Sequence, residues 1–525
     1  MIVIADKLSE FSNLMLKYSI MNEKYLYKPI YNSQNEYIVW MGFPEKYSFS
    51  LSSLGFSWMF KEIDECEGIN TERVCTDIAK TTYEKPDAFG FSLYFDFDFL
   101  EVFKMLEKYN ISLKSADRND NAPLIFAGGP VVTANPKPYS EIFDFFIIGD
   151  GEDVNLNILN YCKTNKNLSK RELLKKISEF EGVYVPIYPK QVIKSTKRLQ
   201  NCIYTPVLSD DAYFKNTFII ELTRGCSNRC GFCLASYLNF PLRSVPTEKL
   251  VETIDFGLKY TNKIAFLGAE VSAHPDFEKI CDYIYERIQN GENIEMNFSS
   301  LRVDAINKKV VKTLVAAGQK SITLAVEAGS ENLRKRINKN ITEDQIINAI
   351  KIAKEFGLKS IKLYGMLGIP SETQEDIEAI IDLAKKVKPV GIEISFGFSS
   401  FVPKANTPFQ WYGREKSNIL EKRIQYLQKQ LHKIGIQTNM PSVKWDYWQA
   451  VLSRGDESFT QFLIDTHNLG GKLGAFKSAA KANNIDSDYY AYENYGFDKK
   501  LPWDFIQMQP SKDFLIKENQ RLTVL

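Results

Sequence analysis

Short apolar runs alternate with amphipathic stretches through the first third of the chain. The runs are YIVWMGF, AFGFSLYF, APLIFAGGP and FDFFIIGDGE. Stretches with apolar residues at helical spacing, SLSSLGFSWMFKEID and DFLEVFKMLEKYN, fall between them. Nearly continuous apolar strands that alternate with helices indicate a parallel sheet covered on both faces. Residues 36–184 are therefore predicted to form a Rossmann-like α/β domain, after a polar lead-in at 1–35.

The same alternation restarts and runs longer between residues 216 and 410. The predicted strands are TFIIELTRG, KIAFLGAE, IEMNFSSLR, SITLAVEAGS, SIKLYGMLGIP and GIEISFGFSSFVP. Helical patterns lie between successive strands. Six strand–helix units, rather than eight, predict an open, partial (β/α)6 TIM barrel with its reactive groups at the carboxyl ends of the strands.

Two further segments lack this rhythm. Residues 185–215 carry prolines, lysines and arginines and are predicted to form a linker or a short hairpin. Residues 411–525 are predicted to form a separate, mainly helical C-terminal cap. The basic helix in this cap, EKRIQYLQKQLHK, is interpreted as a solvated face rather than an RNA-binding surface, because no RNA-binding module accompanies it.

Composition narrows the class of protein only slightly. The 525 residues are 44% hydrophobic and 25% charged, and the formal net charge is +1, so no overall field favours nucleic acid or an anionic membrane. The start, MIVIADKLSE, lacks the basic segment and apolar core of a signal peptide. No apolar run reaches about 18 residues, the length of a membrane span. We therefore expect a cytoplasmic protein without a membrane partner.

Cysteine is the residue whose distribution changes this picture. Three of the eight cysteines, Cys226, Cys230 and Cys233, fall within eight positions in a C-x3-C-x2-C spacing. Structural zinc needs four ligands, and no second cysteine or histidine pair lies nearby. A chance grouping is the remaining alternative. A [4Fe–4S] cluster is favoured, because three thiolates leave one iron open to a chelating cofactor.

The position of these cysteines supports the cluster. They follow the first predicted barrel strand at its carboxyl end. Gly225 and Gly231 flank the motif and allow close backbone approach, and Phe232 places an aromatic ring before the third cysteine.

With these residues the chain resembles the radical S-adenosylmethionine (SAM) enzymes, whose signature is C-x3-C-x2-C with an aromatic residue before the last cysteine. The resemblance covers residues 216–405. It implies reductive cleavage of SAM to a 5′-deoxyadenosyl radical by a [4Fe–4S] cluster, and an external one-electron reductant of the flavodoxin or ferredoxin type.

Motifs on later strands resemble the SAM-binding motifs of that family. The residues that the resemblance assigns to SAM, besides Phe232, are Gly268, Ala269, Glu270, Ser299, Arg302, Glu327, Arg334, Gly368 and Ile369. The sequence departs from the family's Gly-Gly-Glu at Ala269. Other interpretations stay open: solvated carboxylates for Glu270 and Glu327, surface ion pairs for the two arginines, and a simple turn at Gly368.

The N-terminal domain resembles the cobalamin-binding-like domain that precedes many radical SAM barrels. More narrowly, the whole chain resembles an uncharacterised fused family. A cobalamin tail could lie at Ser92, Gly128, Gly129, Gly149 and Gly151. The loop whose histidine ligates cobalt is missing, and no histidine precedes His274. The alternative is a scaffold that only docks against the barrel, so cobalamin is doubtful.

Three functions remain open. The first is a radical SAM enzyme acting on an unknown substrate, with no catalytic residue identifiable beyond the cofactor site. The second is a cobalamin-dependent radical SAM methyltransferase. The third, from a different class, is a non-catalytic iron–sulfur redox sensor or cluster carrier, against which the SAM-type carboxylates argue.

Overall fold

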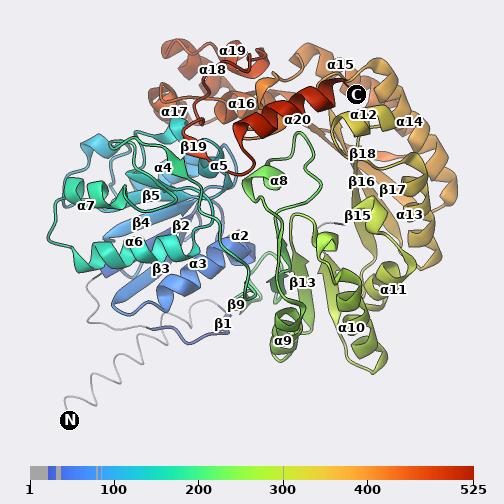
Figure 1. The fold of residues 1–525 in the computed structure, drawn as a ribbon, viewed down its shortest axis with the longest axis horizontal. Coiled ribbons are helices and arrows are strands. Elements are labelled where there is room, and N and C mark those ends of the chain that lie inside the picture. The colour runs from blue at the N-terminus through green and yellow to red at the C-terminus, as the bar shows by residue number, and fades with distance from the viewer. Residues whose placement is uncertain (1–21, 31–36, 79–80, 84, 299–300, 525) are drawn as a thin grey trace.

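In the computed structural model, two α/β layers stand side by side under a helical cap (Figure 1). The structure describes residues 22–30, 37–78, 81–83, 85–298 and 301–524. The predicted fold class is confirmed: an N-terminal parallel sheet, a partial barrel and a mainly helical C-terminal region.

The N-terminal sheet has six strands in the order β3-β2-β4-β5-β6-β7. Its strands are β2 (Tyr37–Phe43), β3 (Ile69–Cys75), β4 (Ala88–Ser92), β5 (Leu124–Gly128), β6 (Phe145–Ile147) and β7 (Val183–Tyr184). All neighbours are parallel except the antiparallel pair β6 and β7. The apolar pattern missed β3, because INTERVC is polar along most of its length.

Helices cover both faces of this sheet and bury its alternate side chains. On one face α3 (Leu54–Asp64), α6 (Glu152–Thr164) and α7 (Lys170–Ile177) pack over Val39, Met41 and Phe126 among others. The short α2 (Tyr47–Ser52) joins them. On the other face α4 (Phe99–Lys108) and α5 (Pro130–Ala134) pack over Trp40, Phe89 and Ile125. The continuous apolar runs follow from this double burial.

Residues 185–215, predicted to form a linker or a short hairpin, do not form a hairpin. The two strands there do not pair with each other. β8 (Val192–Ile193) pairs with β19 (Ile506–Gln507), and β9 (Val207–Ser209) pairs with β1 (Glu23–Tyr25). The segment therefore ties both ends of the chain to the body of the molecule, through pairings that local sequence does not reveal.

The barrel strands form two sheets rather than one. The first contains β10 (Phe218–Glu221), β13 (Lys263–Leu267) and β14 (Glu295–Phe298). The second contains β15 (Ser321–Glu327), β16 (Ser360–Leu367), β17 (Glu393–Ser400) and β18 (Gln437–Asn439). A single bridge between Leu301 and Leu324 links them among the described residues.

Helices line the outside of the barrel, as the alternation predicts. They are α9 (Thr247–Leu258), α10 (Phe277–Gln289), α11 (Lys308–Ala316), α13 (Glu343–Glu355), α14 (Gln374–Val387) and α15 (Ser417–Lys433). Their apolar stripes share one core with the outward side chains of the strands. The predicted boundary at residue 411 needs correction, because α15 packs with this core and β18 extends the sheet.

The cap consists of α16 (Val443–Ser453), α17 (Phe459–Asn468), α18 (Leu473–Ala482), α19 (Ser487–Tyr492) and α20 (Lys512–Val524). Its aromatic side chains join the core under α4 and α5 of the N-terminal sheet. The red helix α20 runs between the two α/β layers, above the short green helix α8 (Leu234–Leu238) (Figure 1). Within the described ranges, no helix has the length and apolar character that crossing a bilayer requires.

Candidate active site

The three clustered cysteines occupy a loop between β11 (Thr223–Arg224) and α8. Gly225 begins the loop with φ +91°, and a Cβ there would lie 2.4 Å from the carbonyl oxygen of Asn239. Only glycine tolerates both conditions. At Gly231 a Cβ would lie 2.8 Å from the ring of Phe409. The cysteine loop is therefore packed closely against Asn239 at one end and against Phe409 at the other.

A second loop anchors the cysteine loop from the opposite side. It follows α12 (Glu331–Arg336), the short helix that comes after β15. The Gly231 amide donates to the carbonyl of Ile337 at 3.0 Å. The Asn338 side chain donates to the carbonyls of Asn228 and Arg229 at 2.7 and 3.1 Å. These bonds hold the backbone of the cysteine loop at Asn228, Arg229 and Gly231, between its first and last thiols.

The thiols themselves suit a buried iron–sulfur cluster. Cys226 and Cys230 are buried and Cys233 is partly so. Burial raises the pKa of the Cys230 thiol to about 12, opposed by Lys339 and reinforced by Cys233. Burial also raises the pKa of Cys233, with Cys226 among the contributing charges. Bound iron would deprotonate the three thiols.

Asn228 adds hydrogen bonds to one sulfur. Its backbone amide and its side-chain Nδ2 approach Cys226 Sγ at 3.5 and 3.4 Å. Among the residues that the structure describes, no three histidine, cysteine, aspartate or glutamate side chains converge on one metal ion. A cube of four irons places its three thiolates on different irons, so the sulfurs stand apart. The donor set fits such a cluster.

Charged side chains from two other strands form a rim beside the thiols. Lys339 Nζ contacts Glu327 Oε1 at 3.1 Å, with both side chains largely buried. Glu327 has φ +64° at a register shift in β15, which turns its side chain out of the regular pleat. Arg302 chelates Asp304 at 2.9 and 3.0 Å and donates to the Lys339 carbonyl at 3.2 Å. Paired cations and carboxylates suit a zwitterionic cofactor tail.

Glu270 joins this rim from the second barrel strand. Its residue is only 3% exposed, and Oε1 accepts from the Ser272 amide at 3.1 Å and from the Ser272 hydroxyl. Burial raises its pKa, while Ser272 and the charge of Arg302 oppose this. A Cβ at Gly268 would lie 2.4 Å from Thr223 Oγ1. Gly268 thus lets the Glu270 turn approach the strand that carries the cysteines.

Other predicted SAM residues fall in different settings. Arg334 is fully buried, and its guanidinium donates to the carbonyls of Ala328, Gly329 and Ile341, each at 2.8 Å. Burial lowers the pKa of Arg334. It therefore holds the loop after β15 together and does not share the rim with Arg302.

The apolar members lie together. Phe232 and Ile369 pack in one small hydrophobic cluster beside the cysteine loop. Gly368 has φ +74° and donates its amide to Glu372 Oε2 at 2.7 Å. Ala269 is exposed. Ser299 lies outside the described residues.

Two of the four glycines predicted for a cobalamin tail, Gly129 and Gly149, lie against the chain's own backbone. A Cβ at Gly149 would lie 2.2 Å from the carbonyl oxygen of Ser195, and one at Gly129 would lie 2.5 Å from that of Leu93. Gly149 forms a parallel bridge with Ser195. Residues 194–197 thus lie along the end of β6, in the crevice where a ligand would enter an open α/β sheet.

The remaining members, Ser92, Gly128 and Gly151, keep space around them: at the two glycines a Cβ would meet atoms only at 3.8 Å or beyond. None of the three histidines of the chain lies in this crevice. His274 contacts the Val245 carbonyl in the barrel, and His467 contacts Glu107 on α4. His432 lies in the last turn of α15. The residues present do not fit a cobalamin with a histidine ligand.

Sequence reasoning missed several residues of the site. Lys339 and Asn338 sit in a short polar loop, RINKNIT, with no periodic pattern to single them out. Glu372 lies two residues after Pro370, where it bonds Gly368 and Arg423. The one available signal was the repeated asparagine around Lys339, because asparagine is enriched at positive φ. Asn338 and Asn340 have φ +59° and +45°.

An open α/β barrel with three thiols and a charged rim at its strand ends defines a class of iron–sulfur enzymes that activate a chelated cofactor. The Radical SAM superfamily model matches residues 220–384, and the model named Radical SAM proteins, N-terminal, matches residues 59–186. The chain belongs to the radical SAM superfamily and is an enzyme of that superfamily.

Two relatives and one solved structure are similar to this chain. An uncharacterized protein of Methanocaldococcus jannaschii is 32% identical over 424 residues, 79% of this chain and 87% of its own. An uncharacterized methyltransferase of Pyrococcus horikoshii is 27% identical over 343 residues, 61% and 69% of the two chains. The fold also matches the radical SAM methyltransferase TsrM of Kitasatospora setae, solved with cobalamin and a [4Fe–4S] cluster, at a TM-score of 0.54 and 12% identity over 85% and 98% of the chains.

Proposed function

We propose that this protein uses a [4Fe–4S] cluster on Cys226, Cys230 and Cys233 to cleave SAM and abstract a hydrogen atom from a substrate in the barrel. When bound and reduced, the cluster supplies one electron to SAM and yields the 5′-deoxyadenosyl radical. The protein itself supplies positioning and exclusion of water. An external reductant of the flavodoxin or ferredoxin type provides the electron, as radical SAM enzymes generally need one.

The residues of the rim have separate tasks in this proposal. Glu270 and Glu327 present carboxylates to the cationic end of SAM, and Lys339 and Arg302 present cations to its carboxylate. Phe232 and Ile369 offer an apolar wall to the adenine side. The charged side chains of the rim already form ion pairs with each other. The charged groups of SAM would therefore replace these internal partners rather than bind to unpaired charges.

One observation carries this proposal: the charged rim and the cysteine loop share an anchor. Lys339 pairs with Glu327 while its neighbour Asn338 bonds the cysteine loop. A simple cluster carrier needs the thiols but has no use for a buried rim of paired charges. The shared anchor favours an enzyme over a redox sensor.

The test is anaerobic reconstitution with iron and sulfide, reduction by dithionite, and measurement of 5′-deoxyadenosine. At least a single-turnover amount is expected from the wild type, and none from Cys230→Ala. Lys309→Met, an exposed lysine on α11, is the surface control and should keep wild-type yield. A wild type that holds a cluster but forms no more product than Cys230→Ala would contradict the proposal.

Methyl transfer with cobalamin is a second candidate. It is favoured by the fold match to TsrM and by the methyltransferase name of the Pyrococcus relative. The Ser195 backbone against Gly149, and the lack of a histidine before His274, argue against it. We therefore place hydrogen abstraction without cobalamin first.

A further inference from the structure

The second barrel sheet, β15 to β18, keeps one of its faces accessible. Its outward residues, among them Ile322, Leu363 and Ile394, are buried against the helices. Most alternate residues on the inner face of β15, β16 and β17 are partly or fully exposed, and the polar ones include Thr323, Lys362 and Ser395. Parallel sheets normally bury both faces. The accessible inner face of this sheet is therefore a candidate surface for a bound molecule.

Two rows of side chains cross this inner face in register. Thr323, Lys362 and Ser395 are neighbours on adjacent strands. In the next row toward the rim, Tyr364 lies between Ala325 and Gly397. Tyr364 is 42% exposed. The small side chains on either side keep the ring accessible, although its edge lies against Gly397.

Glycine at 397 allows a particular arrangement. A Cβ there would lie 2.7 Å from the Tyr364 ring and 2.9 Å from Cε of Lys362. Without that atom the tyrosine ring and the lysine chain both lie close over the strand. Lys362 Nζ is 4.7 Å from the centroid of the Tyr364 ring.

The Lys362 ammonium has no carboxylate at ion-pair distance among the described residues. It is half-buried, so its charge is less screened than that of a surface lysine. An unpaired cation next to an accessible aromatic face attracts an anion attached to a planar ring.

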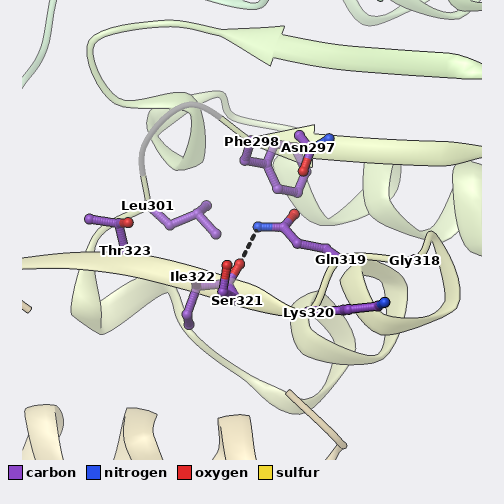
Figure 2. A pocket seen from close by; sticks show the side chains of 9 residues that line it. All are labelled: Asn297, Phe298, Leu301, Gly318, Gln319, Lys320, Ser321, Ile322 and Thr323. Carbon is purple, nitrogen blue, oxygen red and sulfur yellow. Dashed lines mark hydrogen bonds between the residues drawn. The ribbon is translucent and has the colours of Figure 1, made fainter. Parts of the chain in front are cut away.

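A cavity of about 430 Å³ opens beside these rows, between β14 and β15. Figure 2 shows its lining, with Asn297 and Phe298 on one strand facing Gln319, Ser321 and Thr323 on the other side. Thr323 belongs both to this lining and to the row of Lys362, whereas Lys362 and Tyr364 do not line the cavity themselves. Its volume is within the range of about 300–1,000 Å³ typical of small-molecule sites.

We propose that this inner face is the substrate site and that it takes a planar ring bearing a carboxylate or phosphate. The ring lies on Tyr364 and the anionic group contacts Lys362. Glu327, at the rim, follows Ala325 by two residues on the same strand, across the register shift. A ring on Tyr364 would thus lie next to the proposed SAM site. This inference rests on the proposed function and adds the chemical class of its substrate.

Pyridoxal 5′-phosphate is the test probe, because it is planar, carries a phosphate and reacts with amines. Its aldehyde condenses with a lysine amine, losing water to give an imine, and borohydride reduces the imine to a stable secondary amine. Peptide mass spectrometry then measures labelling of each lysine in the reconstituted full chain.

The chain contains a matched control pair on its outer surface. Lys24 Nζ lies over the Tyr260 ring at the same 4.7 Å, and Tyr260 is 39% exposed. We expect Lys362 to be labelled about tenfold faster than Lys24, corresponding to about 1.4 kcal/mol of added binding. Tyr364→Ala should abolish this preference and leave Lys24 unchanged, while Tyr364→Phe should retain it.

Equal labelling of Lys362 and Lys24, or preferential labelling that survives Tyr364→Ala, would overturn the proposed site. Unchanged labelling of Lys24 and unchanged circular dichroism show that each variant is folded. Labelling does not require turnover. Preferential labelling without 5′-deoxyadenosine formation would therefore remove the proposed function alone, whereas 5′-deoxyadenosine formation without preferential labelling would remove this site alone.

Discussion

At the scale of single residues, Glu372 joins the rim to the outer helices. Its carboxylate accepts from the Gly368 amide and contacts Arg423 Nη1 at 3.0 Å. Burial raises the pKa of this carboxyl from 4.5 to about 7, against the effects of Gly368 and Arg423. A buried acid in contact with the Gly368 turn makes this part of the rim sensitive to pH.

The raised pKa of Glu372 determines whether the stability of the fold rises or falls with pH. Glu372 stabilises the fold fully below its unfolded pKa of about 4.5, and that contribution is lost as pH rises through about 7. The full change would be at most about 3 kcal/mol. We therefore expect Glu372→Gln to reduce the loss of urea resistance between pH 5.5 and pH 8, measured as the unfolding midpoint.

Glu375→Gln is the matched control, because Glu375 lies on the surface at the start of α14. It should leave the pH dependence of the midpoint as it is in the wild type. Parallel pH profiles for wild type and Glu372→Gln would show that Glu372 does not titrate in this range.

At the scale of elements, an ionic network joins the N-terminal sheet to the strand that leads into the cysteine loop. Arg224, the last residue of β11, contacts Asp150 at 3.0 Å and Glu152 at 2.8 Å. It also chelates Glu221 at 2.8 Å through both nitrogens. Asp150 also pairs with Arg243 on β12 (Arg243–Ser244), the partner strand of β11. The turn between β6 and α6 thus holds the strand two residues before Cys226.

Asp150→Asn should loosen this connection, since removing one partner of a buried ion pair costs about 3 kcal/mol. Arg224 and Arg243 hold the pKa of Asp150 low despite its burial, so the charge is present at neutral pH. Without it we expect the reconstituted cluster to lose iron to a chelator about tenfold faster. Alkylation of Cys226 by iodoacetamide in the metal-free protein should also accelerate.

Asp144→Asn is the matched control. Asp144 is more deeply buried than Asp150 and pairs with Arg118 at 3.1 Å and Lys170 at 2.8 Å, without contact to the barrel. Its replacement should weaken the N-terminal domain but leave iron loss and Cys226 alkylation unchanged. If both variants release iron at the same rate, the network has no specific role in holding the cysteine loop.

At the scale of the whole molecule, the N-terminal sheet shares a hydrophobic core with the cap, and polar contacts connect it to the end of the barrel. Asp96, after β4, accepts from Lys404 at 2.6 Å, from Gln449 at 2.9 Å and from Ser453 at 2.7 Å. These partners come from the end of the barrel and from α16. Trp503 is buried and donates to Gln410. The N-terminal domain therefore docks firmly, whether or not it holds a ligand.

The position of Ser195 at the end of β6 leads to a prediction about cobalamin binding. After incubation with hydroxocobalamin and desalting, we expect no corrin absorbance to remain with the protein, because Ser195 occupies the space beside Gly149. Stoichiometric retention would contradict this and would move the methyltransferase function to first place. Loss of that retention in Gly128→Leu would then locate the cobalamin at the end of β5.

By itself, the sequence determined what local chemistry decides. Apolar alternation predicted the helices and most parallel strands, and the C-x3-C-x2-C spacing predicted the cluster loop, because strand and helix periods and thiol spacing are local properties. Tertiary structure alone decided which polar residues meet. Lys339 reached Glu327, Ser195 filled the crevice at Gly149, β8 paired with β19, and Tyr364 took its place between Ala325 and Gly397. Those contacts depend on chain segments far apart in sequence and on which small residues leave space, which no local pattern encodes.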